Sequence, residues 1–338
     1  GELERSLAAG VAPDRIVYSG VGKTADELAA ALDAGILQIN AESEAELALI
    51  EEIAGARGAP ASVALRINPD IDAHSHDKIS TGRREDKFGI EWTRIHEVYN
   101  RWSNRKAISL AGLALHIGSQ VTDLGPFRDA FARLRDLVVT LRADGHAVDR
   151  LDLGGGLGIP YDRGMTPSPA QYAGVVQGAV GDLGCRLLFE PGRVIMGNAG
   201  VLVTRVIHVK EGATRRFAIV DAAMNDLMRP ALYGAIHEIV PVVRPPADAA
   251  MESLDVVGPV CETGDSFAVD LPMAPLHRGD LLALRTAGAY GAAMSSTYNS
   301  RPLVAEVLVS GDAFAVIRER VGTRKFLAFE ALPDWLAS

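Results

Sequence analysis

The sequence predicts an α/β protein in which a parallel sheet is followed by an antiparallel β domain. Six apolar, strand-like segments between residues 16 and 192 alternate with helical segments, and such regular alternation is typical of a parallel sheet. Past residue 200, strand-like runs joined by turns replace the helical periods, which indicates antiparallel β structure. We therefore expect two domains, 1–198 and 199–338, with the boundary between Met196 and Gly200.

The same periodicity predicts the individual elements. Strands are expected in the first domain at 16–20, 36–40, 62–68, 112–118, 150–153 and around Phe189. Helices are expected at 2–10, 24–34, 43–55, 93–103 and 126–144. Thr24 and Glu27 have the spacing of a capping box, so the second helix should begin beside Thr24. The strand-like runs of the second domain cover 201–210, 217–220, 254–258, 280–285, 303–309 and 313–318.

The composition is that of an ordinary globular protein. The 338 residues include 48% hydrophobic and 23% charged side chains, and a chain of this length suggests two domains. A net charge of −9 argues against a nucleic-acid surface, which needs clustered Lys and Arg. No apolar run reaches the ~18 residues of a membrane helix. Two cysteines, Cys185 and Cys261, fit a reducing cytosol better than a disulfide framework, so we expect a cytoplasmic protein.

Polar side chains and glycines gather where the predicted strands end. They are Asn40, Arg66, Asn68, His116, Ser119, Gly154 to Gly156, Glu190 and Arg193. In parallel barrels and open sheets the site lies at this carboxyl edge. A closed barrel needs eight strands; with six visible, a barrel implies two further strands before Gly1. The long polar loop 69–89 suggests a lid over the site.

Two strand ends indicate a site for an anionic, ring-containing cofactor. The glycines 154–156 suit close approach of a phosphate, although a tight turn without a ligand has the same sequence pattern. Glu190 is suited to hold a proton on a ring nitrogen, and Arg193 to bind an anion; an ion pair between the two is the structural alternative. His116 either packs as an ordinary histidine or stacks, neutral, on the ring.

The second half offers further candidates. Arg229 and Tyr233 are four residues apart and share a helix face. Cys261 and Glu262 stand together on a turn rich in glycine and acids, and Tyr290 lies between glycines. Each of these has a purely structural alternative. No Cys/His spacing supports a zinc site, so no metal is expected, and neither a Gly-x-Ser-x-Gly elbow nor a P-loop occurs.

Taken together, these residues resemble the barrel-type (fold-type III) pyridoxal-phosphate decarboxylases of basic amino acids, and within them the branch that acts on meso-diaminopimelate. The resemblance extends from Gly1 to about Ala331. The motifs that carry it are 18–24, 78–82, 87–89, 116–119, 154–156, 190–193, 228–233, 261–265 and 288–290. The family has a pyridoxal-phosphate-binding (β/α)8 barrel and a C-terminal β domain, so the resemblance implies that fold here.

The resemblance also implies roles for individual residues. His116 would stack on the cofactor ring and Glu190 would pair with its nitrogen. The phosphate region would be held by Ser119, Gly155, Gly156, Gly192, Arg193 and Tyr290. The far end of the substrate would be bound by Arg193, Arg229, Tyr233, Glu262 and Tyr290. The family is dimeric with shared active sites, and Cys261 would give a proton to Cα after CO₂ has left.

One feature of the family is missing from its expected context. Its Schiff-base lysine lies on the first barrel strand, in a Val-Lys-Ala-Asn-like sequence. The lysines of this chain lie in other settings: Lys23, Lys78, Lys87, Lys106, Lys210 and Lys325. We therefore expect the Schiff-base lysine, like the two additional strands, to lie outside these 338 residues.

Three other functions compete with decarboxylation of meso-diaminopimelate to lysine, the last step of lysine synthesis. A related decarboxylase of ornithine, arginine or carboxynorspermidine shares most of these motifs. Arg229 and Glu262 favour diaminopimelate, because its distal end carries a second amino acid head group, whereas ornithine offers only an ammonium that an arginine repels. A non-catalytic relic without its lysine is the second alternative, and a barrel enzyme of other chemistry is the third.

Overall fold

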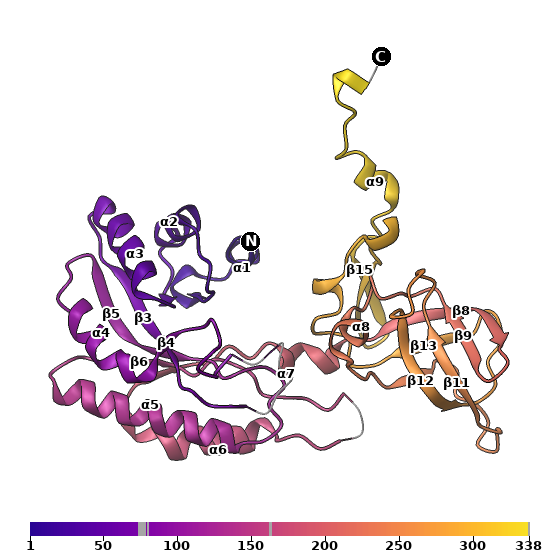
Figure 1. Ribbon diagram of the computed structural model, residues 1–338, viewed down its shortest axis with the longest axis horizontal. Helices are drawn as coiled ribbons and strands as arrows, with labels where there is room; N and C mark the ends of the chain where they lie inside the picture. Colours follow the sequence, from indigo (N-terminus) through magenta and orange to yellow (C-terminus); the bar gives the residue numbers. More distant parts are fainter. Residues whose placement is uncertain (74–78, 80, 162–163, 337–338) are drawn as a thin grey trace. The chain divides into compact units, whose positions relative to one another are not determined.

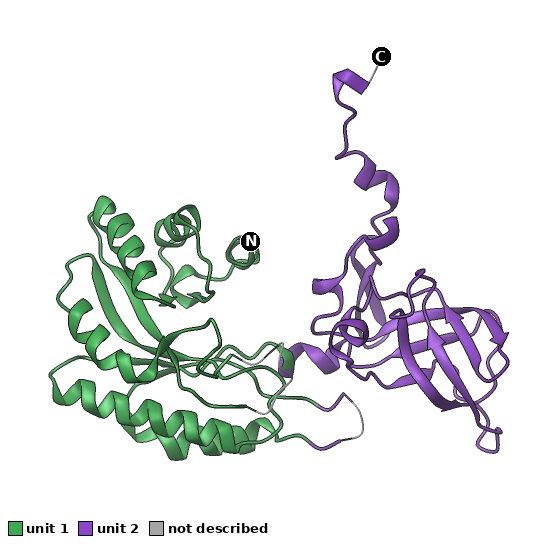
Figure 2. Ribbon diagram, viewed as in Figure 1, with its two compact units in different colours: residues 1–159, 166–193 green, residues 160–165, 194–338 purple. Residues whose placement is uncertain are grey.

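The computed structural model describes residues 1–73, 79, 81–161 and 164–336. It divides into two compact units, residues 1–159 with 166–193 and residues 160–165 with 194–338 (Figure 2). The main change of unit therefore falls between Arg193 and Val194. Within the described ranges, no helix has the length and apolar character needed to cross a membrane.

The first unit is built on a parallel sheet, as predicted. Its strands are β1 (Val17–Tyr18), β2 (Gln38–Ala41), β3 (Ala61–Asn68), β5 (Ile108–Leu115), β6 (Arg150–Asp152) and β7 (Arg186–Leu188). They pair in that order, every pair parallel, with the short strand β4 (Ile90–Glu91) beside the end of β3. All six predicted strands are present. The two residues of β4 were not predicted, because a strand this short leaves no periodic pattern.

Helices cover the outer side of this sheet (Figure 1). They are α2 (Ala25–Ala34), α3 (Glu44–Arg57), α4 (Ile95–Trp102), α5 (Gly125–Ala143) and α6 (Pro169–Val180). The short helix α1 (Glu2–Ala8) buries no residue, and α7 (Arg193–Met196) spans the change of unit. The capping box of α2 is confirmed: the Thr24 hydroxyl accepts from the Glu27 N–H at 3.3 Å, and the Thr24 N–H donates to the Glu27 carboxylate at 2.9 Å. Helix α6 was not predicted.

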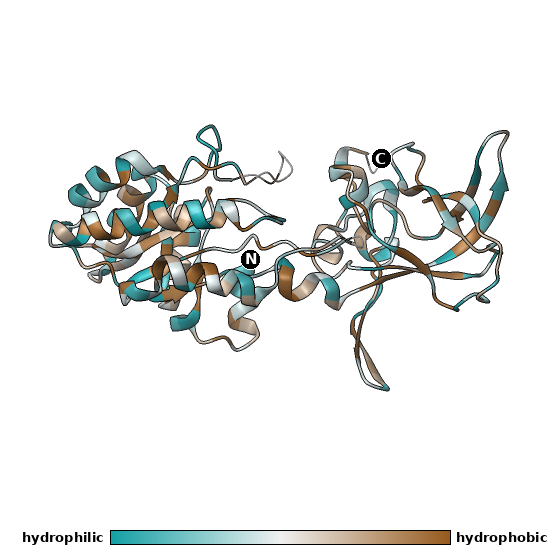
Figure 3. Ribbon diagram, turned by 90° about the horizontal axis from the view of Figure 1, so that it is seen from below, coloured by the Kyte–Doolittle hydropathy of each residue, from teal (hydrophilic) through white to brown (hydrophobic). Residues whose placement is uncertain are grey.

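Burial of one helix face against the sheet accounts for this arrangement. Along α5 the buried side chains recur at helical spacing, among them Phe127, Phe131, Leu134 and Leu141. Strand β3 is buried at seven of its eight positions, as expected for a strand covered on both faces. Figure 3 shows hydrophobic and hydrophilic residues alternating around these helices. The polar ends of the strands are therefore the part of the sheet that is available for chemistry.

The second unit is a β domain with a mixed sheet. Its strands are β8 (Leu202–Glu211), β9 (Arg216–Val220), β10 (Ile239–Pro241), β11 (Glu252–Val257), β12 (Ser266–Met273) and β13 (Leu281–Leu284), in the order β10-β13-β8-β9-β11-β12. The expectation of a purely antiparallel sheet was wrong in one place, because β9 and β11 pair in parallel. The long connection from Asp221 to Met251 permits this, since a parallel pair cannot be joined by a tight turn.

The remaining elements of the second unit are short. A separate antiparallel hairpin joins β14 (Glu306–Ser310) and β15 (Ala313–Arg318), and two one-turn helices are α8 (Arg229–Tyr233) and α9 (Thr323–Leu327). Strands β10 and β12 were not predicted. In β12 the run Asp270-Leu-Pro272 places an acid and a proline, which are both depleted in strands.

The loop that was predicted to act as a lid is described only in part, because residues 74–78 and 80 lie outside the described ranges. Described residues of the loop form hydrogen bonds with the segment that follows β5. The Thr81 hydroxyl donates to the His116 carbonyl at 2.9 Å, and the Ser119 N–H donates to the Ile79 carbonyl at 3.1 Å. These bonds bring the second half of the loop to the predicted site.

Candidate active site at the carboxyl ends of the strands

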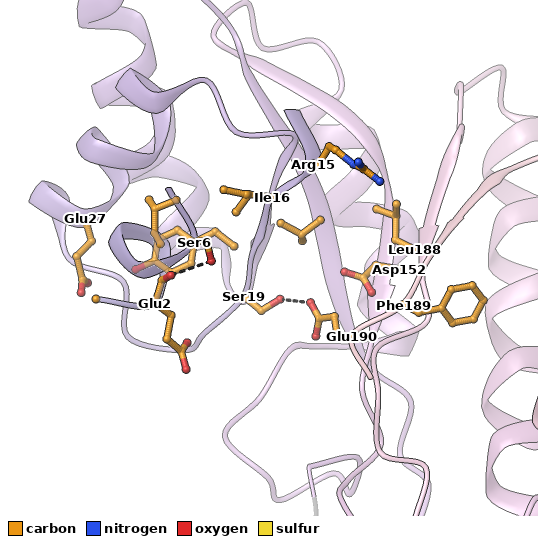
Figure 4. A pocket seen from close by; sticks show the side chains of 14 residues that line it. Glu2, Ser6, Arg15, Ile16, Ser19, Glu27, Asp152, Leu188, Phe189 and Glu190 are labelled. Carbon is orange, nitrogen blue, oxygen red and sulfur yellow. Dashed lines mark hydrogen bonds between the residues drawn. The ribbon is translucent and has the colours of Figure 1, made fainter. Parts of the chain in front are cut away.

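A pocket of about 670 Å³ lies beside the ends of β1, β6 and β7. Ser19, Asp152 and Glu190 line it and contribute its polar groups at these strand ends (Figure 4). Leu188 and Phe189 line the pocket next to Glu190 and supply apolar surface. The lining of the pocket is therefore mixed, with polar groups converging beside an apolar wall.

Glu190 follows β7 and accepts a hydrogen bond from the Ser19 hydroxyl at 2.7 Å. The pKa of Glu190 is raised from 4.5 to about 7, mainly because the surrounding protein desolvates the carboxyl group and secondly because Asp152 carries a negative charge nearby. The residue is exposed to solvent overall, so the desolvation acts on the side of the carboxyl that faces the protein. A cationic N–H partner would stabilise the ionised form of a carboxyl group whose pKa is raised in this way.

Asp152 ends β6 and is 1% exposed. Its carboxylate accepts from the Gly154 N–H at 3.0 Å and from the Asn40 side-chain amide at 2.7 Å. The same amide nitrogen donates to the Ser19 hydroxyl at 2.9 Å, and Gln38 donates to the Asn40 carbonyl oxygen at 2.8 Å. The buried acid is therefore linked to Glu190 through Asn40 and Ser19.

His116 lies directly after β5 and is held neutral. Burial lowers its pKa to about 4, and the positive charge of Arg66 acts in the same direction. The Gly155 N–H donates to Nδ1 at 3.2 Å, which leaves the ring proton on Nε2. A neutral, oriented imidazole at a strand end is suited to stacking against a flat heteroaromatic ring.

The three glycines pack the turn closely against its neighbours. A Cβ at Gly155 would lie 2.3 Å from the Glu190 carbonyl oxygen, and one at Gly156 would lie 2.2 Å from the Gly118 carbonyl oxygen. Gly154 and Gly156 also have φ of +63° and +98°, which favours glycine. Glycine is therefore required here for contact between three strand ends, a need that the sequence pattern alone did not separate from phosphate binding.

Replacing Gly155 by Ala should displace the Glu190 backbone. We expect Gly155→Ala to destabilise the protein by about 1–3 kcal/mol, as overpacking does, and to weaken pyridoxal-phosphate binding. Urea unfolding and equilibrium dialysis measure the two effects. The control is Gly174→Ala on an exposed face of α6, where the new Cβ meets nothing within 4 Å; it should be neutral or stabilising. Equal behaviour of the two variants would contradict this account.

The residues at the strand ends fit the pyridoxal phosphate implied by the resemblance. Glu190 offers a carboxyl group that gains from a cationic ring nitrogen, and His116 offers a neutral ring. The exposed Gly192 and Arg193, which is 8% exposed at the start of α7, lie two and three residues after Glu190. The Gly155 N–H is already bonded to His116, so a phosphate at this turn has to use other donors. Among the described residues, no cluster of His, Cys, Asp and Glu suits a metal ion.

In the second unit, Arg229 opens helix α8 and is buried rather than on the surface, at 6% exposed. Its Nη1 lies 2.8 Å from Nε2 of His237, and its guanidinium lies 3.9 Å from the centre of the Tyr161 ring. Nδ1 of His237 is 2.9 Å from the Arg285 carbonyl oxygen, so this nitrogen carries the proton and Nε2 accepts from Arg229. Tyr233 closes the same helix.

The turn that carries Cys261 and Glu262 is fixed by Asp265, which is 3% exposed. The Asp265 carboxylate accepts from the N–H groups of Val260 at 2.8 Å and Met224 at 2.7 Å. Cys261 is exposed, and Glu262 accepts from the Tyr298 hydroxyl at 2.9 Å. The turn thus presents a thiol and a carboxylate from a rigid base.

Replacing Asp265 by Ala removes both hydrogen bonds and leaves two N–H groups without their acceptor. We expect the free energy of unfolding to fall by about 2–4 kcal/mol, measured by urea denaturation. Asp248→Ala, at an exposed acid of the same unit, is the control and should change it by under about 0.5 kcal/mol. A loss at Asp265 no larger than the control's would be inconsistent with a fixed turn.

Tyr290 has a φ of +59° and is 40% exposed. A bulky residue in this region is uncommon and is often found at functional sites. Gly288, two residues earlier, has no room for a side chain, because a Cβ there would lie 2.0 Å from the Met196 carbonyl oxygen. The strand-to-loop segment is therefore held in a shape that exposes the tyrosine.

Sequence reasoning did not assign a role to several residues of these sites. Ser19, Asp152, His237 and Tyr298 each make a hydrogen bond to a predicted site residue or to its partner. Asp152 gave a usable signal, since an acid inside an apolar strand needs partners. The other three are ordinary polar residues in loops, and only the tertiary structure brings them to their partners.

The chain is similar to known proteins over nearly its whole length. The family model for the pyridoxal binding domain of pyridoxal-dependent decarboxylases matches residues 1–197. The diaminopimelate decarboxylases of Zymomonas mobilis and Vibrio cholerae are 48% and 47% identical over 338 residues, which cover 99% of this chain and 80% of each relative. The crystal structure of diaminopimelate decarboxylase from Helicobacter pylori complexed with L-lysine matches with a TM-score of 0.93 at 40% identity, covering 97% of this chain and 82% of that one.

These likenesses confirm the predicted fold class, a barrel-type pyridoxal-binding domain followed by a β domain. They extend across nearly the whole chain and therefore include both compact units. The chain belongs to the family of pyridoxal-dependent decarboxylases.

Proposed function

We infer that the protein is a pyridoxal-phosphate-dependent carboxy-lyase that converts meso-2,6-diaminopimelate to L-lysine and CO₂, the last step of lysine biosynthesis. The observation that carries this is the 48% identity to a diaminopimelate decarboxylase over 99% of the chain. The site supports it independently: Glu190, with a raised pKa, stands beside the neutral His116 and the glycine turn. This set suits a flat cofactor with a basic ring nitrogen.

The residues at the strand ends bind and orient the cofactor. Glu190 would hold the proton on the ring nitrogen, and His116 would stack on the ring. Ser119, Gly156, Gly192, Arg193 and Tyr290 are the candidates for the phosphate region, and Gly155 allows close approach there while its N–H orients His116. When bound, pyridoxal phosphate supplies a ring that accepts the electron pair left by the departing carboxylate.

Residues of the second unit recognise the part of the substrate that does not react. Because L-lysine keeps one L centre, the carboxylate that leaves is that of the D centre, and the L head group stays intact. Arg229 and Tyr233 bind this head group, with Arg193 and Tyr290, and the carboxylate of Glu262 binds its ammonium. Cys261 gives the proton that replaces CO₂ on the carbon.

Two further properties complete the proposal. The protein forms a homodimer in which the turn with Cys261 and Glu262 completes the partner's site, which is supported by the resemblance; sedimentation of the purified enzyme tests it. It acts in the cytoplasm, which the free cysteines and the biosynthetic role of its relatives support. We expect neither nucleic acid nor membrane as a partner.

The test of the proposed function is substrate competition. The purified holoenzyme, with pyridoxal phosphate present, should release CO₂ from meso-diaminopimelate with a kcat/KM at least ~100-fold above that for ornithine or arginine, since a distal arginine disfavours a distal cation. A preference for ornithine or arginine would replace diaminopimelate as the substrate. Release of CO₂ from none of them would leave the chain as a non-catalytic relative.

A further inference from the structure

We propose that Asp152 is a positioning residue that turns the ends of β6 and β7 into a two-carboxylate site for the protonated ring nitrogen of the cofactor. In this role Asp152 fixes Glu190 through a chain of hydrogen bonds and adds a second negative charge behind Glu190. The inference deepens the proposed function and rests on the cofactor assigned there. Asp152 itself does not contact the substrate in this role.

The backbone brings the two acids together. Asp152 pairs with Leu188 in the parallel register of β6 and β7. The pairing continues past the ends of both strands, because the Leu153 N–H donates to the Leu188 carbonyl at 2.9 Å and the Glu190 N–H donates to the Gly154 carbonyl at 2.8 Å. Figure 4 shows the Asp152 carboxylate next to Glu190. The distance between the two acids is therefore set by the sheet.

The side chains form a directed chain of hydrogen bonds from one acid to the other. Ser19 donates its hydroxyl proton to Glu190 at 2.7 Å, so its oxygen accepts from the Asn40 amide at 2.9 Å. The same amide nitrogen donates to Asp152 at 2.7 Å, and Gln38 fixes the orientation of the amide by donating to its oxygen at 2.8 Å. The chain of donors therefore ends on the two carboxylates, with Ser19 donating to Glu190 and Asn40 donating to Asp152.

Two of the nearby cations are committed to another acid, and a third, Arg15, lines the same pocket as the two carboxylates. Lys23 donates to Glu46 at 2.6 Å, and Arg66 donates to Glu42 at 2.6 Å. The donors to Asp152 named above are neutral, so its negative charge is not cancelled by them. The negative charge of Asp152 disfavours ionisation of Glu190, which agrees with the raised pKa of Glu190. A cationic ring nitrogen relieves this repulsion, so the site selects the protonated ring.

The test uses two cofactor forms that differ only at the ring nitrogen. Equilibrium dialysis measures the dissociation constants of pyridoxal phosphate and of 1-deazapyridoxal phosphate, in which carbon replaces that nitrogen, for wild type, Asp152→Asn and Ser19→Ala. We expect Asp152→Asn to weaken the binding of pyridoxal phosphate about tenfold more than the binding of the deaza form. Ser19→Ala removes the hydrogen bond from Ser19 to Glu190 without changing charge. It should change both dissociation constants by the same factor.

Equal weakening of both forms by Asp152→Asn would overturn the proposal, because a purely structural role affects both alike. No weakening of either form would overturn it as well. If the variant does not fold, the nitrogen-15 shift of labelled cofactor bound to wild type decides: the ring nitrogen should stay protonated from about pH 6 to 9, and loss of its proton in that range contradicts the proposal. Failure of wild type to bind pyridoxal phosphate at all would instead refute the proposed function.

Discussion

Replacement of Glu190 by Gln is expected to lower kcat by about 10²–10⁴-fold and to change KM for meso-diaminopimelate by only a few fold. The amide cannot hold a proton on the ring nitrogen, and acid–base groups in this role contribute rate factors of that order. KM changes little because Glu190 belongs to the cofactor side of the site. Steady-state release of CO₂ at saturating pyridoxal phosphate measures both constants.

The same variant has a pH signature in the cofactor-free protein. The pKa of Glu190 is raised from 4.5 to about 7, so the folded state keeps a proton that the unfolded state has lost. The contribution of this group to stability therefore falls as pH rises from about 4.5 to 7, and Gln has no such loss. We expect Glu190→Gln to raise Tm relative to wild type at pH 8 but not at pH 5.

A suitable control for both measurements is Glu2→Gln, which changes an acid lining the same pocket. Glu2→Gln should leave kcat close to the wild-type value, and its Tm should match that of wild type at both pH 5 and pH 8. If Glu190→Gln keeps more than about a tenth of the wild-type kcat, Glu190 is not the group that holds the ring proton.

Replacement of Arg229 by Ala should raise KM for meso-diaminopimelate by about 100-fold with a smaller change in kcat. The guanidinium is buried and oriented by His237 and Tyr161. Losing a buried partner of a carboxylate costs about 2–5 kcal/mol, of which 100-fold is about 2.7 kcal/mol. Because the head group does not react, the loss falls mainly on binding.

The matched control is Arg244→Ala, which removes an exposed arginine of the same unit and should leave KM unchanged. Dissociation constants for L-lysine and for 1,5-diaminopentane add a second comparison. Arg229→Ala should weaken the binding of L-lysine, which carries the head-group carboxylate. It should leave the binding of the diamine unchanged. An unchanged KM, or equal weakening of both ligands, would remove Arg229 from the substrate site.

The sequence predicted most of the fold because its local signals were strong. The Thr24–Glu27 capping box and the buried run of β3 are local patterns, and both are present. Helix α6 was missed because glycines at 174 and 178 interrupt its helical pattern, yet packing against α5 stabilises it. The parallel pairing of β9 with β11 depends on where a long connection returns, which no local pattern specifies.

The candidate site was predictable to a different degree. Glu190 and His116 stood out because polar residues that end apolar strands converge at one edge of a sheet. The supporting residues Ser19 and Asn40 lie 171 and 112 positions from their partners Glu190 and Asp152, so their bonds follow only from tertiary structure. Arg229 was noted from its spacing to Tyr233, but the histidine that orients it was not.

The central claim is tested most directly by the product formed in heavy water. The purified holoenzyme is incubated with meso-diaminopimelate in D₂O, and the lysine is examined by mass spectrometry and NMR. The expected product is L-lysine with one carbon-bound deuterium, located at Cε, and one CO₂ per lysine, because a deuteron from an exchangeable group replaces the carboxylate at the D centre. Absence of lysine, or deuterium at Cα of the L centre instead of Cε, would contradict it.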